Sequence, residues 1–219
     1  MASQKFSFVT VDPVSGSGDQ AVNFSGEKHT GRLQRTVNLT VTTNGGAKKA
    51  LVVNQAAAAE VVRSDSPNAS VQKTGGNVTI TGKSNSTKLT FAVTPAEENG
   101  LTLQLPANYT AAGKITANGA VIADDPGAAG EFVWSITISD VPTNVTIEEL
   151  TATLKVTAAG GQIASVTVTQ AAGDSTIELD KEIINLDVNG TQQTVNVTSN
   201  DSWTWTQAAA RTVLRMMGR

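Results

Sequence analysis

Residues 37–57, VNLTVTTNGGAKKALVVNQAA, return 115 positions later as residues 152–172, ATLKVTAAGGQIASVTVTQAA. Aligned without a gap, 9 of the 21 positions are identical, and they include the Gly-Gly pair at the centre and the Gln-Ala-Ala at the end. Two runs with alternating apolar residues flank this Gly-Gly turn, where glycine reaches the positive φ that other residues adopt only with steric strain. The pattern predicts a β-hairpin that occurs twice in an array of similar β units. Arrays of this kind usually bind or build and seldom catalyse.

The composition indicates an all-β class and excludes several functions. Of the 219 residues, 39% are hydrophobic, which is enough for a core, and two smaller domains are favoured over one large one. The abundant Thr, Val, Asn, Ala and Gly are typical of short strands joined by polar turns. A formal net charge of −3 without a large basic cluster argues against a nucleic-acid partner. Because cysteine is absent, no disulfide framework, thiol nucleophile or thiolate metal site is available.

Turn signals divide the chain into segments with different numbers of strands. Residues 1–58 contain strand candidates at 6–11, 21–24, 35–42 and 49–54. Residues 60–173 contain candidates near 69–71, 77–81, 88–94, 101–105, 114–122, 131–139, 149–158 and 163–169, which fit one complete immunoglobulin-like β-sandwich. Residues 174–207 contain candidates at 176–179, 182–188, 193–198 and 202–206. The expected core of the middle segment consists of Leu89, Phe91, Leu103, Val133, Ile136, Leu154, Val156, Val166 and Val168.

The last segment, residues 208–219, differs in composition from the rest. Its sequence, AAARTVLRMMGR, contains good helix formers and no acidic residue, so we predict a short amphipathic helix that is too short to be stable alone. Methionine-rich apolar faces adapt well to partner surfaces, so we predict that this segment is a docking tail. The expected partner-docking residues are Arg211, Val213, Leu214, Arg215, Met216 and Met217. The alternative is a frayed, solvated terminus.

Residues 175–207, STIELDKEIINLDVNGTQQTVNVTSNDSWTWTQ, resemble the opening half of a BACON domain, an immunoglobulin-like module of Bacteroidetes proteins and their phages. The residues that carry the resemblance are the Asn-Gly turn at 189–190, the alternating run 193–198 and the segment 199–203. Residues 6–57 resemble the closing half of the same module, and the middle segment is similar to a whole but divergent copy. The resemblance therefore implies tandem BACON-like sandwiches.

Each half-sandwich would leave sheet edges and an apolar face uncovered, which soluble proteins rarely tolerate. We therefore expect residues 1–58 and 174–207 to complete one BACON-like sandwich. Pairing within one chain would make a circularly permuted module, whereas pairing between chains would link subunits head to tail. The sequence leaves both routes open.

The candidate sites are few. Trp203 and Trp205 lie two apart on an expected strand and share a face. We expect Trp203 in the core and keep Trp205 as a candidate glycan contact, since the resemblance to BACON modules implies carbohydrate binding. Trp134 is expected in the core. The paired acids, such as Asp124 and Asp125, are expected to be solvated loop residues. His29 is the single histidine, so no His-based triad or multi-histidine metal site forms within one chain, and we expect neither catalysis nor a cofactor or metal.

Two functions follow from these features. The amino-terminal sequence MASQKFSFVTVDP lacks a signal-type apolar region, and no apolar run is long enough to span a membrane, so no membrane partner is expected. One expectation is a virion structural protein, made in the host cytoplasm: a capsid decoration (auxiliary capsid) protein or head fibre of a Bacteroides phage of the crAss-like type. Its partners would be the major capsid protein or other virion proteins, copies of itself, and glycans. The alternative is a carbohydrate-binding surface module of a Bacteroidetes cell, which would require an export signal or an attached enzyme.

Overall fold

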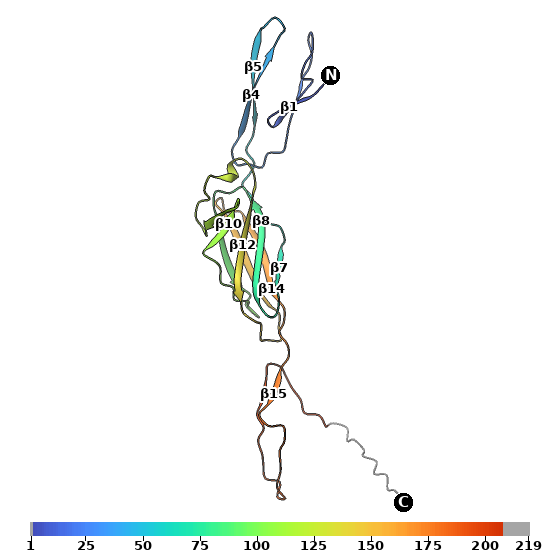
Figure 1. The fold of residues 1–219 in the computed structure, drawn as a ribbon, viewed down its shortest axis with the longest axis vertical. Coiled ribbons are helices and arrows are strands. Elements are labelled where there is room, and N and C mark those ends of the chain that lie inside the picture. Colours follow the sequence, from blue (N-terminus) through green and yellow to red (C-terminus); the bar gives the residue numbers. More distant parts are fainter. Residues whose placement is uncertain (1, 208–219) are drawn as a thin grey trace, which may run out of the picture.

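The computed structural model describes residues 2–207 and shows an all-β molecule, as the composition predicts. Figure 1 shows an elongated shape in which three β units follow one another along the long axis. We call them the N-terminal unit (residues 2–58), the central sandwich (60–173) and the C-terminal unit (174–207). The N-terminal and C-terminal units lie at opposite ends of the central sandwich.

The central sandwich consists of two sheets that pack around one core. The first sheet has the order β11-β10-β12-β8-β6, and the second has the order β7-β14-β13-β9. The strands of the first sheet are β6 (Val62–Ser64), β8 (Gly76–Ser84), β10 (Asn108–Ala111), β11 (Lys114–Ala117) and β12 (Phe132–Val141). Those of the second are β7 (Asn68–Val71), β9 (Leu89–Pro95), β13 (Leu150–Ala158) and β14 (Ile163–Gln170). A short 3₁₀ helix, η1 (Pro126–Ala128), lies in the loop before β12.

Alternation along the strands places apolar side chains between the two sheets. Eight of the nine expected core residues are buried: Leu89, Phe91, Leu103, Ile136, Leu154, Val156, Val166 and Val168. Val133 is the exception, because its neighbour Trp134 points into the core and strand alternation therefore turns Val133 outward. Trp134 is fully buried, as expected, and makes an edge-on contact with the ring of Phe91, with the ring centroids 5.5 Å apart.

The N-terminal unit is a smaller pair of sheets. One sheet has the order β1-β2-β3, and the other is the hairpin of β4 and β5. The strands are β1 (Gln4–Phe6), β2 (Val9–Asp12), β3 (Asn23–Gly26), β4 (Arg35–Thr42) and β5 (Lys48–Gln55). Phe8, Val9 and Val11 form a small buried cluster against the partly buried Val37, Leu39 and Val53 of the hairpin.

The C-terminal unit has few paired strands. β15 (Ile177–Leu179) pairs antiparallel with β16 (Val197–Ser199), and a long loop connects them. The expected strands at 182–188 and 202–206 are absent, and the expected strand at 193–198 is reduced to β16. The reason is that, among the described residues, no backbone forms a hydrogen-bonded ladder with these segments, although their sequences alternate as strands do.

Two further strand predictions are wrong. The segment 6–11 is interrupted by a turn between β1 and β2, with Ser7 at a φ of 57°. The segment 101–105 is irregular, although Leu101 and Leu103 are buried as the alternation suggested. The tail predicted as a docking helix, residues 208–219, lies outside the described residues.

Candidate interaction surfaces at the two ends of the molecule

The joint between the N-terminal unit and the central sandwich is held by the side chain of Asn85. This side chain is fully buried and bonds three backbone groups. Its Oδ1 accepts a hydrogen bond from Val61 N at 2.8 Å, and its Nδ2 donates to Thr30 O and Ala59 O, both at 2.9 Å. Asn85 therefore connects the end of β8 to the linker and to the N-terminal unit.

The joint between the central sandwich and the C-terminal unit repeats this arrangement with Asn200. Its Oδ1 accepts from Thr176 N at 2.8 Å, and its Nδ2 donates to Val145 O and Asp174 O, both at 2.8 Å. Each of these four residues lies 115 positions after its counterpart around Asn85. The molecule thus joins successive units twice in the same way.

Strand registers repeat with the same spacing. Arg35 pairs with Gln55 in the first hairpin, and Leu150 pairs with Gln170 in the second. Both hairpins turn at a glycine with a φ of +87°, Gly46 and Gly161.

The match extends to the C-terminal unit: β15 and β16 pair Ile177 with Ser199, as β6 and β8 pair Val62 with Ser84. The terminal units are therefore partial structural copies of the central sandwich. The Ser-Asn dipeptides at 84–85 and 199–200 were the sequence signal for the joints, and sequence reasoning missed them.

The paired acids Asp124 and Asp125 lie at or near the joint between the N-terminal unit and the central sandwich, which is the upper joint in Figure 1. Arg32 forms an ion pair with Asp125, and its Nε donates to Asn85 O at 2.6 Å. Asp124 pairs with Lys114, and this contact lowers the pKa of the Asp124 carboxyl below its usual value, chiefly through the hydrogen bond. Both acids are thus engaged with basic side chains.

The single histidine also lies near the upper joint. His29 Nε2 contacts Leu33 O at 2.7 Å. Among residues 2–207, no three His, Asp or Glu side chains cluster in a way that suits a metal ion. The described part of the chain also contains no helix long and apolar enough to cross a bilayer.

The N-terminal unit exposes residues that are core residues in the central sandwich. Val41 is 69% exposed, whereas its equivalent Val156 is fully buried. Leu51 is 44% exposed, whereas its equivalent Val166 is 1% exposed. Burial of Val156 and Val166 depends on the strands of the central sandwich that have no counterpart in the N-terminal unit.

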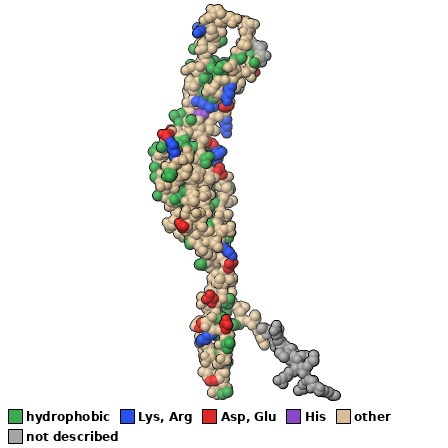
Figure 2. Space-filling model, viewed as in Figure 1, with side chains coloured by type: hydrophobic (Ala, Val, Ile, Leu, Met, Phe, Trp, Pro, Cys, Tyr) green, Lys and Arg blue, Asp and Glu red, His purple; other side chains and the backbone are tan. Residues whose placement is uncertain are grey.

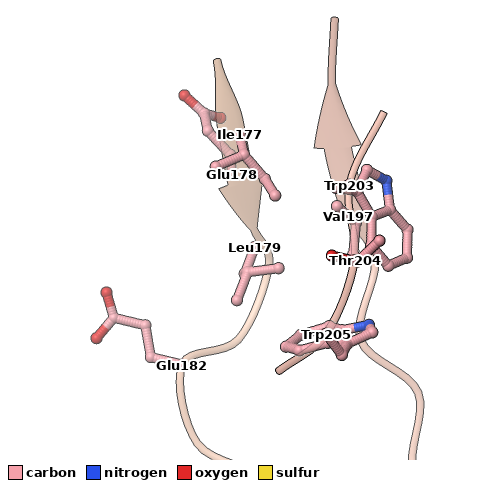
Figure 3. Close-up of a pocket in the computed structure, with 8 residues that line it drawn as sticks. All are labelled: Ile177, Glu178, Leu179, Glu182, Val197, Trp203, Thr204 and Trp205. Atoms are coloured by element: carbon pink, nitrogen blue, oxygen red, sulfur yellow. The ribbon is translucent and has the colours of Figure 1, made fainter. Parts of the chain in front are cut away.

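The C-terminal unit shows the same difference. Ile177 is 58% exposed and Leu186 is 62% exposed, whereas their equivalents Val62 and Val71 are buried. An apolar groove of about 550 Å³ opens on this unit (Figure 3). It is lined by Ile177, Glu178, Leu179, Glu182, Val197, Trp203, Thr204 and Trp205.

The two tryptophans of this groove are both exposed. Their rings meet edge to face with centroids 5.9 Å apart. Trp205 is exposed, as a glycan contact requires, but the expected burial of Trp203 is wrong within one chain. By the 115-residue repeat Trp203 is equivalent to Lys88, which is only half-buried in the central sandwich, so this position does not belong to a core. The other predicted contacts, Arg211, Val213, Leu214, Arg215, Met216 and Met217, lie outside the described residues.

The terminal units carry opposite net charges. Residues 1–58 contain six Lys or Arg and three Asp or Glu, for a net charge of +3. Residues 174–207 contain one Lys and six Asp or Glu, for a net charge of −5. Figure 2 shows the acidic side chains gathered over the C-terminal unit.

These features define an elongated, multi-unit all-β protein with an uncovered apolar face at each end. The chain belongs to the Toastrack DUF4097 family, whose match covers residues 33–205. This match runs from the start of the β4–β5 hairpin through the central sandwich to the groove tryptophans. No curated protein matches the sequence.

Proposed function

We propose that the protein is a non-enzymatic virion structural protein, a capsid decoration or head-fibre protein of a Bacteroides phage of the crAss-like type. Its units would be tandem immunoglobulin-like, BACON-like sandwiches, and its partners the major capsid protein or other virion proteins. The observation that supports this most is the repeated construction of a rod. The same asparagine joint occurs at both ends of the central sandwich, as suits a protein that extends from a surface or connects subunits across it.

The protein content of purified virions tests this proposal. We expect the chain at a fixed ratio to the major capsid protein in mass spectrometry of particles banded in a density gradient. Detection only in the cell envelope of the host would contradict it.

Attachment through the tail is a separate part of the proposal. We expect removal of residues 208–219 to abolish binding to particles that lack the protein, because this segment combines three arginines with apolar residues. Circular dichroism of the truncated chain should be unchanged. Equal occupancy of the truncated and full chains on particles would exclude the tail as the attachment point.

The exposed tryptophan pair favours a second candidate, a carbohydrate-binding surface module of a Bacteroidetes cell. Trp203 and Trp205 offer exposed ring faces on a groove that Glu178 and Glu182 line from the opposite side (Figure 3), and such rings suit stacking on a sugar. A glycan array with the full chain tests this candidate. Binding that Trp205→Ala abolishes would support it, and the absence of binding to any glycan would remove it.

A further inference from the structure

The terminal units together contain a set of strand segments equivalent to most of the central sandwich. β4 and β5 correspond to β13 and β14, and β3 corresponds to the end of β12. β15 and β16 correspond to β6 and to the end of β8. Residues 183–186 correspond to β7, and residues 204–207 correspond to the start of β9. The C-terminal unit thus supplies counterparts of β6, β7 and parts of β8 and β9, which the N-terminal unit lacks, whereas β10 and β11 have a counterpart in neither unit.

We propose that the C-terminal unit of one copy completes the N-terminal unit of a second copy, so that copies join head to tail through a composite sandwich. The occupant of each uncovered face is the opposite end of another molecule of this chain. Exchange of strands between copies satisfies backbone groups at open sheet edges and buries both apolar faces. A contact between two different surfaces builds a filament unless its rotation closes a ring.

The central sandwich gives the register of this contact. β7 pairs parallel with β14, with Asn68 opposite Thr167 and Val71 opposite Gln170. The equivalent of β7 lies 115 residues later in the C-terminal unit, and the equivalent of β14 lies 115 residues earlier in the N-terminal unit. The same register therefore places Ile183 of one copy opposite Val52 of the next, and Leu186 opposite Gln55. Residues 183–186 pair with no strand among residues 2–207 of their own chain.

Hydrogen bonds beside β14 predict further contacts. Ala171 N donates to Val71 O at 3.1 Å, so Ala56 N of one copy should donate to Leu186 O of the other. Gln55 Nε2 already donates to Glu27 O at 2.8 Å, which is the equivalent of the bond from Gln170 to Pro142 O at 2.7 Å. The side chain of Gln55, on the edge strand β5, therefore already makes the hydrogen bond that its equivalent Gln170 makes in the complete central sandwich.

Charge and geometry favour pairing of opposite ends of different copies. The net charges of +3 and −5 attract unlike ends and oppose contact between two like ends. Pairing within one chain would have to bridge the length of the central sandwich, where the ten residues of β12 alone span roughly 33 Å. Figure 1 shows the two units at opposite ends of this body.

Mixing two single-cysteine variants of the full chain tests the register. Val52→Cys and Ile183→Cys replace exposed residues whose equivalents, Thr167 and Asn68, are also exposed, so neither change removes a core side chain. The natural sequence has no cysteine to interfere. We expect mild oxidation of the mixture to give a disulfide-linked dimer, and the double variant to give a ladder of multimers.

The matched control replaces the partner cysteine by Ile115→Cys, an exposed position on the central sandwich. A mixture of this variant with Val52→Cys should yield no crosslink above background. The proposal is overturned if the Val52→Cys and Ile183→Cys mixture crosslinks no better than this control. A crosslink confined to the monomer in the double variant, or an equally strong crosslink in either single variant alone, would overturn it too.

A second pair of variants tests burial of the apolar face. Leu186 and Val188 are both exposed in the same segment, but Leu186 is equivalent to the buried Val71, whereas Val188 is equivalent to Lys73, which lies outside the core and is only half-buried. In sedimentation velocity of the full chain, Leu186→Asp should weaken association at least tenfold, whereas Val188→Asp should leave it within about twofold. Equal effects would contradict the composite core.

The inference concerns contacts between copies and does not depend on the proposed virion function. If the chain were absent from virions, the crosslinks would still be expected, and only the proposed function would fail. If the protein were abundant in virions but did not crosslink, the composite sandwich alone would fail.

Discussion

Two polar residues show how single side chains stabilise this rod. Asn85 is buried with its amide bonded to three backbone groups, which replaces the hydrogen bonds that these groups would make to water. Glu131, before β12, receives a bidentate contact from Arg63 of β6, with N–O distances of 2.6 and 2.5 Å. One residue fixes a joint, and the other connects a central strand to an edge strand.

Replacing Asn85 by Ala should lower the free energy of unfolding by about 3 kcal/mol, because three backbone groups in a buried site lose their partner. The control is Asn200→Ala, whose site is partly exposed, so water can replace the amide there. Urea unfolding of the central sandwich, followed by Trp134 fluorescence, measures both variants. Equal losses in the two variants would mean that burial at the upper joint is not decisive.

The Arg63–Glu131 contact should make stability depend on pH. The hydrogen bond from Arg63 holds the pKa of the Glu131 carboxyl below its usual 4.5. Its contribution is therefore fully present above about pH 4.5 in the folded protein and is lost as the pH falls through the lowered pKa. Glu131→Gln should flatten the decline of melting temperature between about pH 5 and pH 3. An unchanged pH profile in this variant would show that other carboxyls dominate.

At the scale of strands, β12 is the element that most clearly separates sequence pattern from structure. Its burial alternates, with Phe132, Trp134, Ile136 and Ile138 buried. The sequence shows this alternation, but the expected core includes Val133, which the structure places on the outer face of the strand. In a strand, alternate residues face the core, so one residue known to be buried determines which set faces inward. In β12 this residue is Trp134, which is fully buried.

Paired substitutions in β12 test this phase. Ile136→Ala should destabilise the protein by about 2–4 kcal/mol, because it leaves a cavity between the two sheets. Val133→Ala, a smaller change on the exposed face, should cost less than about 0.5 kcal/mol. Chemical denaturation of both variants, fitted with one common dependence of the free energy of unfolding on denaturant concentration, compares the two losses. A large loss for Val133→Ala would indicate that its outer face is covered by another surface.

At the scale of the whole molecule, stability and association reside in different parts. The central sandwich contains nearly all of the buried apolar side chains, and the two ends carry most of the exposed large ones. Its strands pair with one another without any strand from the terminal units. The ends therefore contribute surface rather than core.

A fragment of residues 59–173 should fold alone, with a β-type circular dichroism spectrum and one cooperative melting transition. It should remain monomeric at concentrations at which the full chain associates, because it lacks both uncovered faces. Loss of the contacts that Thr30 and Arg32 make to Asn85 and Asp125 should reduce its stability by about 1–3 kcal/mol relative to the same sandwich in the full chain. A disordered spectrum would contradict this prediction and would mean that the sandwich needs residues outside 59–173 to fold.

The sequence by itself determined the local elements: both Gly-Gly hairpins, the all-β class and eight of the nine expected core residues. These follow from turn chemistry and alternation, which act between residues close in the chain. Only the tertiary structure decided which apolar residues lie exposed, such as Trp203 and Leu186, and that the two partial copies lie at opposite ends. Burial of a strand requires neighbours supplied by distant segments, so identical patterns become core in one unit and open surface in another.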